Sequence, residues 1–192
     1  MEAASDLYTQ EYFDGLRWRV DSSVAAVVPA IIELFAPSSA LDLGCGDGRW
    51  TLALAGRGVR TRGIDTAGVS RDEHPLATFE YGDLTAAAPG AYGRADVCLC
   101  LEVVEHLHEG DADAVVALIA SCSDVVIFSA ATPGQGGTGH LNEQLHEFWI
   151  GRFAQSGFVA DPEWRGTFAG NDQIAPWYRA NMIVFTRPIG ES

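Results

Sequence analysis

The 192-residue chain carries 12 basic and 26 acidic side chains, which gives a formal net charge of −14, and 47% of its residues are hydrophobic. This length and apolar content predict a single domain over residues 1–192 with a real hydrophobic core, and they exclude intrinsic disorder as the main state. The negative charge repels phosphate backbones and anionic lipid, so we expect a small-molecule partner and neither nucleic acid nor membrane. All basic residues are arginine, which excludes mechanisms that need a lysine.

No segment has the pattern of a membrane span or a secretion signal. The first apolar run, 24–36, is interrupted by Pro29 and Glu33 and is too short to cross a bilayer. The cysteines at positions 45, 98, 100 and 122 include no Cys-x-x-Cys pair, so neither a zinc knuckle nor a thioredoxin-like site is indicated. We therefore expect a cytoplasmic protein with reduced thiols. The oligomeric state stays open.

The hydrophobic pattern alternates between helical and extended periods along the chain. In chain order it predicts a helix at 20–35, a strand at 40–43, a helix at 50–55, strands at 59–64, 78–81 and 96–101, a helix at 112–120, a strand at 124–129, a helix at 143–156 and a strand at 181–186. Strands that alternate with helices are typical of crossover units on a parallel sheet, and they predict an α/β fold.

A glycine-rich turn joins the first predicted strand to the next helix. Residues 41–48 read Leu-Asp-Leu-Gly-Cys-Gly-Asp-Gly, and glycines there let the backbone pass close to a ligand beside the free N–H groups of a helix start. A tight turn needed only for chain geometry is the competing interpretation. Because position 49 is Arg49 where a dinucleotide fingerprint needs glycine, a nicotinamide or nucleotide-sugar enzyme is disfavoured. Asp42 suits a ligand with an ammonium group.

Acidic residues also follow the next three strands. Asp65 closes the second strand, Asp83 follows the third and Glu102 follows the fourth. The carboxyl ends of parallel strands meet at one edge of a sheet, which is where open sheets bind ligands. A carboxylate after the second strand can accept hydrogen bonds from both ribose hydroxyls, and one after the third can accept from an adenine amino group. Each acid alone is equally compatible with a solvated loop or a helix cap, but their joint order predicts a nucleoside site.

These motifs resemble those of class I S-adenosylmethionine-dependent methyltransferases. The match runs over 41–48, 63–65, 82–84 and 96–107, in the family's order and spacing. The resemblance implies a doubly wound three-layer α/β sandwich, with a seven-stranded, mostly parallel sheet and one antiparallel strand from a hairpin after residue 158. It implies S-adenosylmethionine as cofactor and S-adenosylhomocysteine as product. It also implies N-terminal helices over 1–37 that act as a lid on a core over 38–192.

The resemblance further implies which residues contact the cofactor. It places Asp42, Gly44 and Gly46 at the methionine end, Asp65 at the ribose, Asp83 at the adenine, and Leu101 with Glu102 beside the sulfonium. The full predicted set is Asp42, Gly44, Cys45, Gly46, Asp65, Thr66, Gly82, Asp83, Leu84, Leu101 and Glu102. Four N-terminal aromatic residues either close over the cofactor or pack an N-terminal helix: Tyr8, Tyr12, Phe13 and Trp18.

A histidine-containing segment follows the fifth strand and should overhang the methyl pocket. Residues 139–144 read Gly-His-Leu-Asn-Glu-Gln, which resembles a Gly-His-x-Asn-Glu-Gln segment of methyltransferases that act on small metabolites and sugars. A hydroxyl acceptor needs a base as its proton leaves, and we predict His140 as that catalytic base. A role in ordering the loop is the alternative. Asn142 is expected to cap the following helix.

Glu102, Glu105 and His106 stand at positions i, i+3 and i+4, so a helical turn would place them on one face, where they could ligate a divalent ion. Small-RNA 2′-O-methyltransferases and some ubiquinone-pathway O-methyltransferases show a similar Glu-x-x-Glu-His, with a later histidine that His140 or His146 matches. The same letters occur in methyltransferases without a metal. A metal is therefore not the favoured prediction, and no metal ligand is assigned.

The sequence thus predicts methyl transfer from S-adenosylmethionine to a small molecule, to an oxygen of a sugar or secondary metabolite ahead of a nitrogen. One alternative is a metal-assisted enzyme like the 2′-O-methyltransferases. Another is a catalytically silent scaffold that binds the cofactor or a partner chain. Acceptor specificity is expected to come from the N-terminal helices and from residues 131–150.

Overall fold

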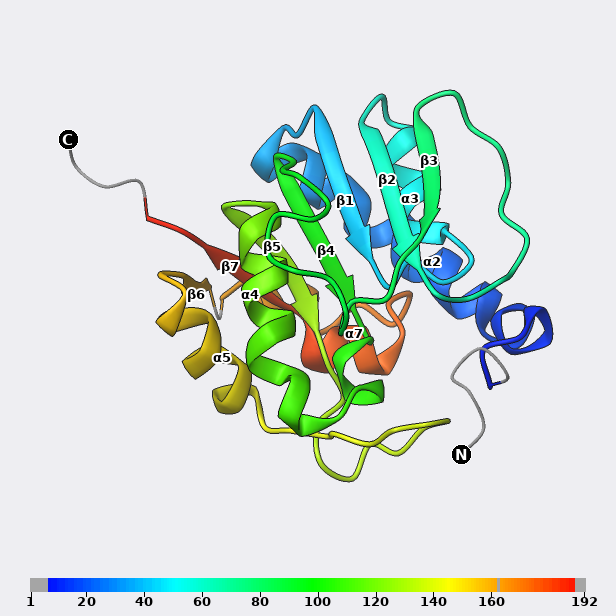
Figure 1. Cartoon of the computed structure of the whole chain (residues 1–192). Coiled ribbons are helices and arrows are strands. Elements are labelled where there is room, and N and C mark those ends of the chain that lie inside the picture. Colours follow the sequence, from blue (N-terminus) through cyan, green and yellow to red (C-terminus); the bar gives the residue numbers. More distant parts are fainter. Residues whose placement is uncertain (1–6, 162, 189–192) are drawn as a thin grey trace.

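The structure of the protein is a computed structural model that describes residues 7–161 and 163–188. A seven-stranded sheet runs through its centre in the order β3-β2-β1-β4-β5-β7-β6 (Figure 1). The strands are β1 (Ser39–Leu43), β2 (Arg60–Asp65), β3 (Ala77–Tyr81), β4 (Val97–Leu101), β5 (Val125–Ser129), β6 (Val159–Asp161) and β7 (Ile183–Thr186). Residues 1–6, at the start of the expected N-terminal lid, and residues 162 and 189–192 lie outside the described part.

The direction of the strands agrees with the predicted fold class. Strands β1 to β5 pair in parallel wherever they are neighbours. Strand β7 runs antiparallel to both β5 and β6, so it is the single antiparallel strand. The doubly wound, mostly parallel seven-stranded fold is thereby confirmed. The extent of the domain stays a prediction.

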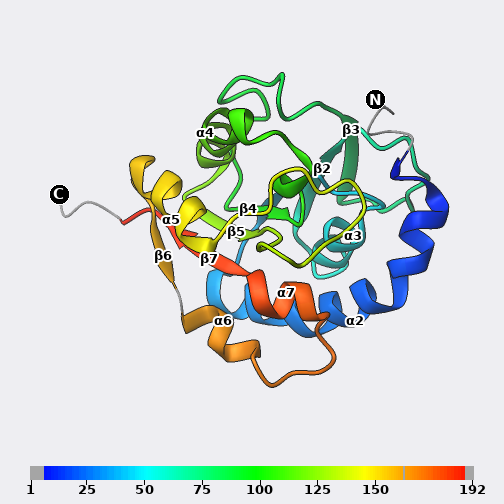
Figure 2. The same cartoon turned by 90° about the horizontal axis from the view of Figure 1, so that it is seen from below.

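Helices cover both faces of the sheet and make the second and third layers (Figure 2). The helices are α2 (Gln10–Phe35), α3 (Arg49–Ala55), α4 (Ala112–Cys122), α5 (His146–Gln155), α6 (Glu163–Phe168) and α7 (Pro176–Asn181), with short 3₁₀ turns η1 (Val104–His106) and η2 (Glu109–Asp111). Apolar residues of α2, α3, α6 and α7 pack on one face, while those of α4 and α5 pack on the other. Each face therefore has its own hydrophobic core.

The two halves of the long helix α2 contact different parts of the protein. Thr9 caps its start by accepting a hydrogen bond from the Tyr12 N–H at 3.3 Å, and the helix ends at Ala36, whose φ is 42°. The second half buries an apolar stripe against the sheet, which the sequence predicted. Apolar periodicity did not indicate the first half, because its residues cover no core, and only the family resemblance implied a helix there. Its inward side instead borders the ligand cavity described below.

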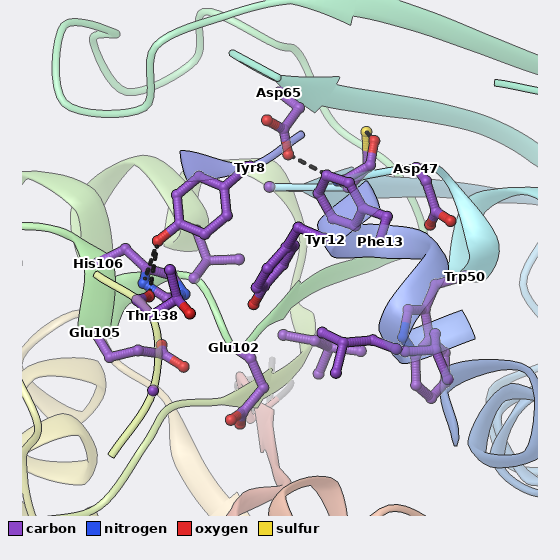
Figure 3. Close-up of a pocket in the computed structure, with 18 of the residues that line it drawn as sticks. Tyr8, Tyr12, Phe13, Asp47, Trp50, Asp65, Glu102, Glu105, His106 and Thr138 are labelled. Carbon is purple, nitrogen blue, oxygen red and sulfur yellow. Dashed lines mark hydrogen bonds between the residues drawn. The ribbon is translucent and has the colours of Figure 1, made fainter. Parts of the chain in front are cut away.

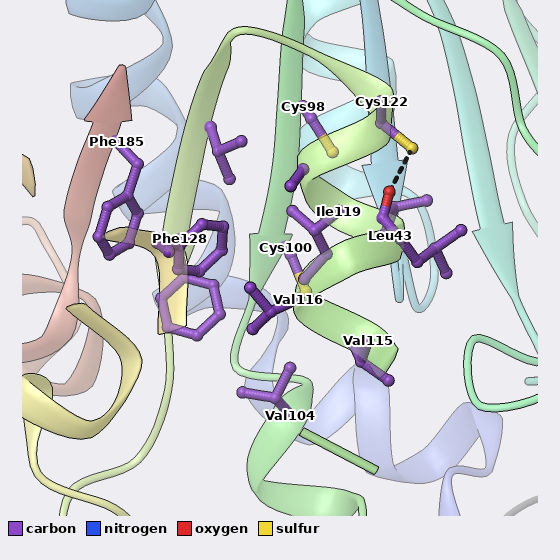
Figure 4. Packing of buried hydrophobic residues seen from close by; sticks show 14 of the residues in the cluster. Leu43, Cys98, Cys100, Val104, Val115, Val116, Ile119, Cys122, Phe128 and Phe185 are labelled. Atoms are coloured by element: carbon purple, nitrogen blue, oxygen red, sulfur yellow. Dashed lines mark hydrogen bonds between the residues drawn. The ribbon is translucent and has the colours of Figure 1, made fainter. Parts of the chain in front are cut away.

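Strand β4 is buried on both faces, because the core under α4 and α5 covers one face and the core under α2 covers the other. Valine and isoleucine side chains of α4 lie against Cys98 and Cys100 of β4 (Figure 4). Towards β7, the Phe153 ring stacks on Phe185 with ring centroids 4.1 Å apart. All four cysteines, each within the described part, are free and buried.

Several predicted boundaries were wrong near the C-terminal half. Helix α5 begins at His146, three residues later than predicted, and Leu145 is its N-cap residue. Asn142 therefore does not cap it: this side chain is buried and accepts a hydrogen bond from Gln144 at 2.9 Å. Asn181, predicted to open the last strand, is instead the end of α7. Among the described residues, no helix is both long and apolar enough to cross a bilayer.

Candidate active site

A cavity of about 600 Å³ opens at the carboxyl ends of β1, β2 and β4. Every residue predicted from the sequence to touch the cofactor lines it, and so does His140. Tyr8, Tyr12 and Phe13 reach into it from the N-terminal side (Figure 3). Trp18 does not line it, and 68% of its surface is exposed. The structure thus brings the predicted residues together, while their roles toward a cofactor stay predictions.

The glycine-rich turn after β1 forms one wall of the cavity. Gly44, Gly46 and Gly48 all have positive φ angles, of 75°, 54° and 83°. A β-carbon at Gly46 would lie 2.6 Å from the Phe13 ring, so a side chain there has no room. Both the conformation and the packing therefore require glycine in this turn.

Asp65, at the end of β2, faces the same turn with both carboxylate oxygens engaged. Its Oδ2 accepts a hydrogen bond from the Gly46 N–H at 2.7 Å (Figure 3), and its Oδ1 accepts from the Ala67 N–H at 2.6 Å. Each oxygen of a carboxylate has two lone pairs, so one per oxygen remains for a ligand. The two backbone bonds hold the carboxylate in a fixed orientation at the cavity.

Asp42 lies deeper, behind the turn, where only 3% of its surface is exposed. Its Oδ2 accepts a hydrogen bond from the Thr51 hydroxyl at 2.6 Å. Burial raises the pKa of Asp42 to about 6, because the charged form is poorly solvated there, and the nearby charge of Asp65 adds to the rise. A cationic ligand group would favour the charged form.

Glu102, which follows β4, has a strained backbone and a well-held side chain. Its φ of 54° is rare for a residue other than glycine, and its N–H donates to the carbonyl oxygen of Ser129 at 2.9 Å. Its carboxylate accepts hydrogen bonds from Gln135 at 3.0 Å and from Asn181 at 3.3 Å. Burial raises the pKa of this carboxyl. The left-handed backbone means that the helical turn expected to align Glu102 with Glu105 does not form.

Three other side chains form a compact group that can bind a cation. One ligand atom from each of Glu105, His106 and His140 lies within 4.8 Å of the others. Glu105 is fully buried, and among the described residues neither of its carboxylate oxygens has a hydrogen-bond partner. The sequence pattern had offered Glu102 together with Glu105, His106 and a later histidine, His140 or His146. In the structure Glu102 is not part of this group, and its carboxylate accepts hydrogen bonds from Gln135 and Asn181 instead.

Burial sets the charge state of this group, here called the Glu105 cluster. It raises the pKa of Glu105 well above the usual range, and the adjacent Glu102 raises it further. It lowers the pKa of His106 to about 4, so that this imidazole is neutral at physiological pH. The Tyr8 hydroxyl lies 2.7 Å from His106 Nδ1 and donates to the Thr138 carbonyl oxygen at 3.2 Å (Figure 3).

His140 is oriented by Glu143, a residue whose role the sequence did not reveal. His140 Nδ1 lies 2.8 Å from Glu143 Oε1, and Glu143 also accepts from the N–H groups of Gly134 and Gly136 at 2.8 and 2.7 Å. The hydrogen bond from His140 lowers the pKa of Glu143, followed by the bond from Gly134. Because an ionised carboxylate only accepts, Nδ1 carries a proton, and in the neutral form of the imidazole the lone pair is then on Nε2.

Two amide side chains of the site were also missed. Gln135 comes from the loop after β5 and Asn181 from the end of α7, and Asn181 donates to Gln135 at 2.7 Å while both bind Glu102. No local pattern marks these residues, because they meet only when β7 and α7 return to the sheet. Only Glu143 could have been found from the sequence, because it stands three residues after the predicted base His140.

Comparison with known proteins identifies the class. A family model described as a methyltransferase domain matches residues 17–162, and the chain belongs to this family. A ubiquinone biosynthesis O-methyltransferase of Burkholderia lata is 36% identical over 100 residues, which cover 45% of this chain and 39% of that protein. A protein of the same name in Paraburkholderia phytofirmans is 33% identical, over 47% of this chain and 40% of its own length. The chain thus spans about two fifths of these relatives.

Solved structures show the same fold. An amino pentose methyltransferase of Micromonospora echinaspora with bound S-adenosylmethionine is 18% identical, with a TM-score of 0.70 over 93% of this chain and 97% of that one. The magnesium protoporphyrin IX methyltransferase of Synechocystis PCC 6803 with bound S-adenosylhomocysteine is also 18% identical, with a TM-score of 0.68 over 96% and 98%. The predicted class, an S-adenosylmethionine-dependent methyltransferase with a Rossmann-like fold, is confirmed.

The burial of Asp42 leads to a prediction about stability. Between about pH 4 and pH 6 the folded state keeps the proton on Asp42 while the unfolded state loses it, so the wild-type protein loses stability as the pH rises through this window. Asp42→Asn removes this loss, and Thr51 can still donate to the amide oxygen. We expect the variant to gain up to about 3 kcal/mol relative to wild type between pH 4 and pH 8.

Chemical denaturation of both ligand-free proteins at a series of pH values measures this difference. Any packing cost of the amide is independent of pH, so only the change of the difference with pH is informative. Parallel stability curves for the two proteins would show that Asp42 is ionised as easily in the folded state as in the unfolded chain.

Proposed function

We propose that the protein transfers a methyl group from S-adenosylmethionine to an oxygen of a small-molecule acceptor, a hydroxyl of a sugar or secondary metabolite. The observation that carries this proposal is the convergence of the glycine-rich turn, Asp42, Asp65 and Glu102 on one cavity of about 600 Å³. That volume is typical of small-ligand pockets. An expected cytoplasmic location and the expected absence of a nucleic-acid partner stay predictions.

The charges of the cavity support a cationic cofactor. When bound, S-adenosylmethionine supplies an electrophilic methyl group on a positively charged sulfur. Asp42 and Glu102 surround the cavity with carboxyl groups whose pKa values burial raises, so a cation nearby stabilises their charged forms. Asp65 keeps a lone pair on each oxygen for the two ribose hydroxyls. Asp83 is exposed beside it, where it can accept from an adenine amino group.

An oxygen acceptor is supported by the relatives and by the histidine of the loop. The partial relatives are named O-methyltransferases, and one structural neighbour is named as acting on an amino pentose. Glu143 holds His140 Nδ1–H, so Nε2 is left to remove the proton of an acceptor hydroxyl. Alignment of that oxygen with the methyl group then supplies most of the acceleration.

Cofactor binding is tested with Asp65→Ala. This change removes a hydrogen-bonding charged group, so we expect the Kd for S-adenosylhomocysteine to rise about ten- to a hundredfold, measured by calorimetry. Gly46→Val should be worse, because its side chain meets the Phe13 ring. Asp113→Ala, which removes an exposed carboxylate of α4, is the control and should bind normally. Unchanged affinity in Asp65→Ala would remove the assignment of the ribose site.

The catalytic base is tested with His140→Asn. Loss of general-base help is expected to lower kcat by roughly a hundredfold or more and to leave the affinity for S-adenosylhomocysteine nearly unchanged. His108→Asn, at an exposed position outside the cavity, is the matched control. Formation of S-adenosylhomocysteine from S-adenosylmethionine and a panel of hydroxylated acceptors gives the rate. Wild-type turnover by His140→Asn would show that this residue only orders the loop. Absence of turnover by the wild-type protein with every acceptor tested would favour the scaffold alternative.

The Glu105 cluster supports a second proposal, that a divalent cation such as magnesium or manganese assists the transfer. A buried carboxyl without a hydrogen-bond partner and a neutral imidazole are both ligands for divalent cations, and the three ligand atoms are close enough to share one. A bound cation would lower the pKa of an acceptor hydroxyl that coordinates it. In this alternative Glu105, His106 and His140 are ligands.

Chelation distinguishes the two proposals. If the cation is needed, exhaustive treatment with a chelator should abolish turnover, and magnesium or manganese should restore it. Glu105→Gln should then bind manganese at least tenfold more weakly in calorimetry, whereas Glu109→Gln on the exposed turn η2 should bind it normally. Turnover that is indifferent to the chelator, with no manganese bound, would contradict the metal-assisted mechanism and leave His140 as the base.

A further inference from the structure

An arginine behind the wall of the cavity holds the two loops that form its ribose side. Arg71 lies in the segment between β2 and β3 and does not itself line the cavity. Its Nε donates to the carbonyl oxygen of Gly46 at 2.8 Å, and its Nη2 donates to the carbonyl oxygen of Ala67 at 3.0 Å. One guanidinium group thus joins the glycine-rich turn to the segment that follows β2.

The same two residues are bound from the other side by Asp65. The N–H groups of Gly46 and Ala67 donate to the two oxygens of Asp65 at 2.7 and 2.6 Å. Gly46 and Ala67 therefore give their N–H groups to the carboxylate and their carbonyl groups to Arg71. The acid and the arginine act on each other through the backbone of these two residues.

The guanidinium group is itself held in place by packing. It lies over the Phe79 ring of β3, with its central carbon 5.3 Å from the ring centroid. That ring fills the space beside Gly48 and Gly63, where an added β-carbon would come within 2.7 and 2.8 Å of it. Arg71 thus stands on a rigid support, and a planar group with several donors in one plane suits two carbonyl groups better than the ammonium of lysine does.

We propose that Arg71 is a positioning residue of the cofactor site, which fixes the glycine-rich turn and the Asp65 carboxylate in the orientation that receives the ribose hydroxyls. This inference rests on the proposed cofactor. The turn has positive φ angles at three glycines, so it has little conformational preference of its own and depends on bonds from outside. Arg71 supplies those bonds to its carbonyl side.

This role predicts a specific pattern of losses. Without Arg71, Asp65 would no longer be held at the correct angle, so binding of the adenosine half should weaken while the acceptor side stays intact. The KM for S-adenosylmethionine should therefore rise with little change in kcat at saturating cofactor. Because Arg71 acts through Asp65, removing both side chains should cost little more than removing Asp65 alone.

The test is calorimetry with two probes, S-adenosylhomocysteine and adenosine, on the full chain. Arg71→Ala should raise the Kd for both probes about ten- to a hundredfold, and Arg71→Lys should give an intermediate rise. The double variant with Asp65→Ala should be at most about threefold weaker than Asp65→Ala. Arg94→Ala is the matched control, since Arg94 also donates to a backbone carbonyl and pairs with Asp124, but just before the amino ends of β4 and β5. Its affinities should equal wild type.

Each outcome decides the inference. Wild-type affinity in Arg71→Ala or Arg71→Lys, or losses from Arg71 and Asp65 that add fully, would overturn the positioning role while leaving the proposed function intact. Failure of the wild-type chain to bind S-adenosylhomocysteine would overturn both. If Arg71→Ala does not fold, the lysine variant with and without Asp65→Ala provides the same comparison, with melting temperatures to show that the proteins are folded.

Discussion

The pairing of β1 with β2 is the constraint on which the cavity depends. The two strands are parallel, with Leu43 opposite Ile64, so the turn after β1 begins beside the end of β2. The N–H groups of Gly44 and Cys45 both donate to the Ile64 carbonyl oxygen, at 2.8 and 3.2 Å. This contact brings the turn within reach of Asp65. A shift of β2 by one residue relative to β1 would exchange the two faces of β2 and separate these groups.

The second feature of the site is that several of its acidic groups are buried away from water. Asp42 and Glu105 are buried, and burial raises the pKa of both. Such groups destabilise the ligand-free fold when they are charged, because the lost solvation is not fully replaced, and at Asp42 the charge of Arg71 offsets only part of the loss. They make sense in a protein that binds a cation at this place, since the ligand then supplies the missing charge. The overall charge of −14 is in this respect less informative than the few acids in the cavity.

Local patterns predicted β1 to β5 and the residues at their carboxyl ends, because these depend on short apolar runs and on the residues directly after them. Asp42, Asp65 and Glu102 all come to the expected edge. What the sequence did not predict are contacts between distant segments. Gln135 and Asn181 meet at Glu102, and Arg71 reaches Gly46, only through the folded chain. The left-handed backbone of the first residue after β4 was also hidden, since glutamate gives no local sign of a positive φ.

His140 is the residue at which the two mechanistic proposals exclude each other. Its Nδ1 is engaged by Glu143, so one nitrogen atom, Nε2, is left for chemistry. A lone pair that coordinates a cation cannot also remove a proton, so in the metal-assisted alternative the proton of the acceptor must leave by another route. The carboxylate behind the imidazole supports either role, because it fixes the orientation of the ring and leaves Nε2 free to act. The orientation of His140 by Glu143 is therefore common to both mechanisms. What separates them is whether Glu105 binds a cation.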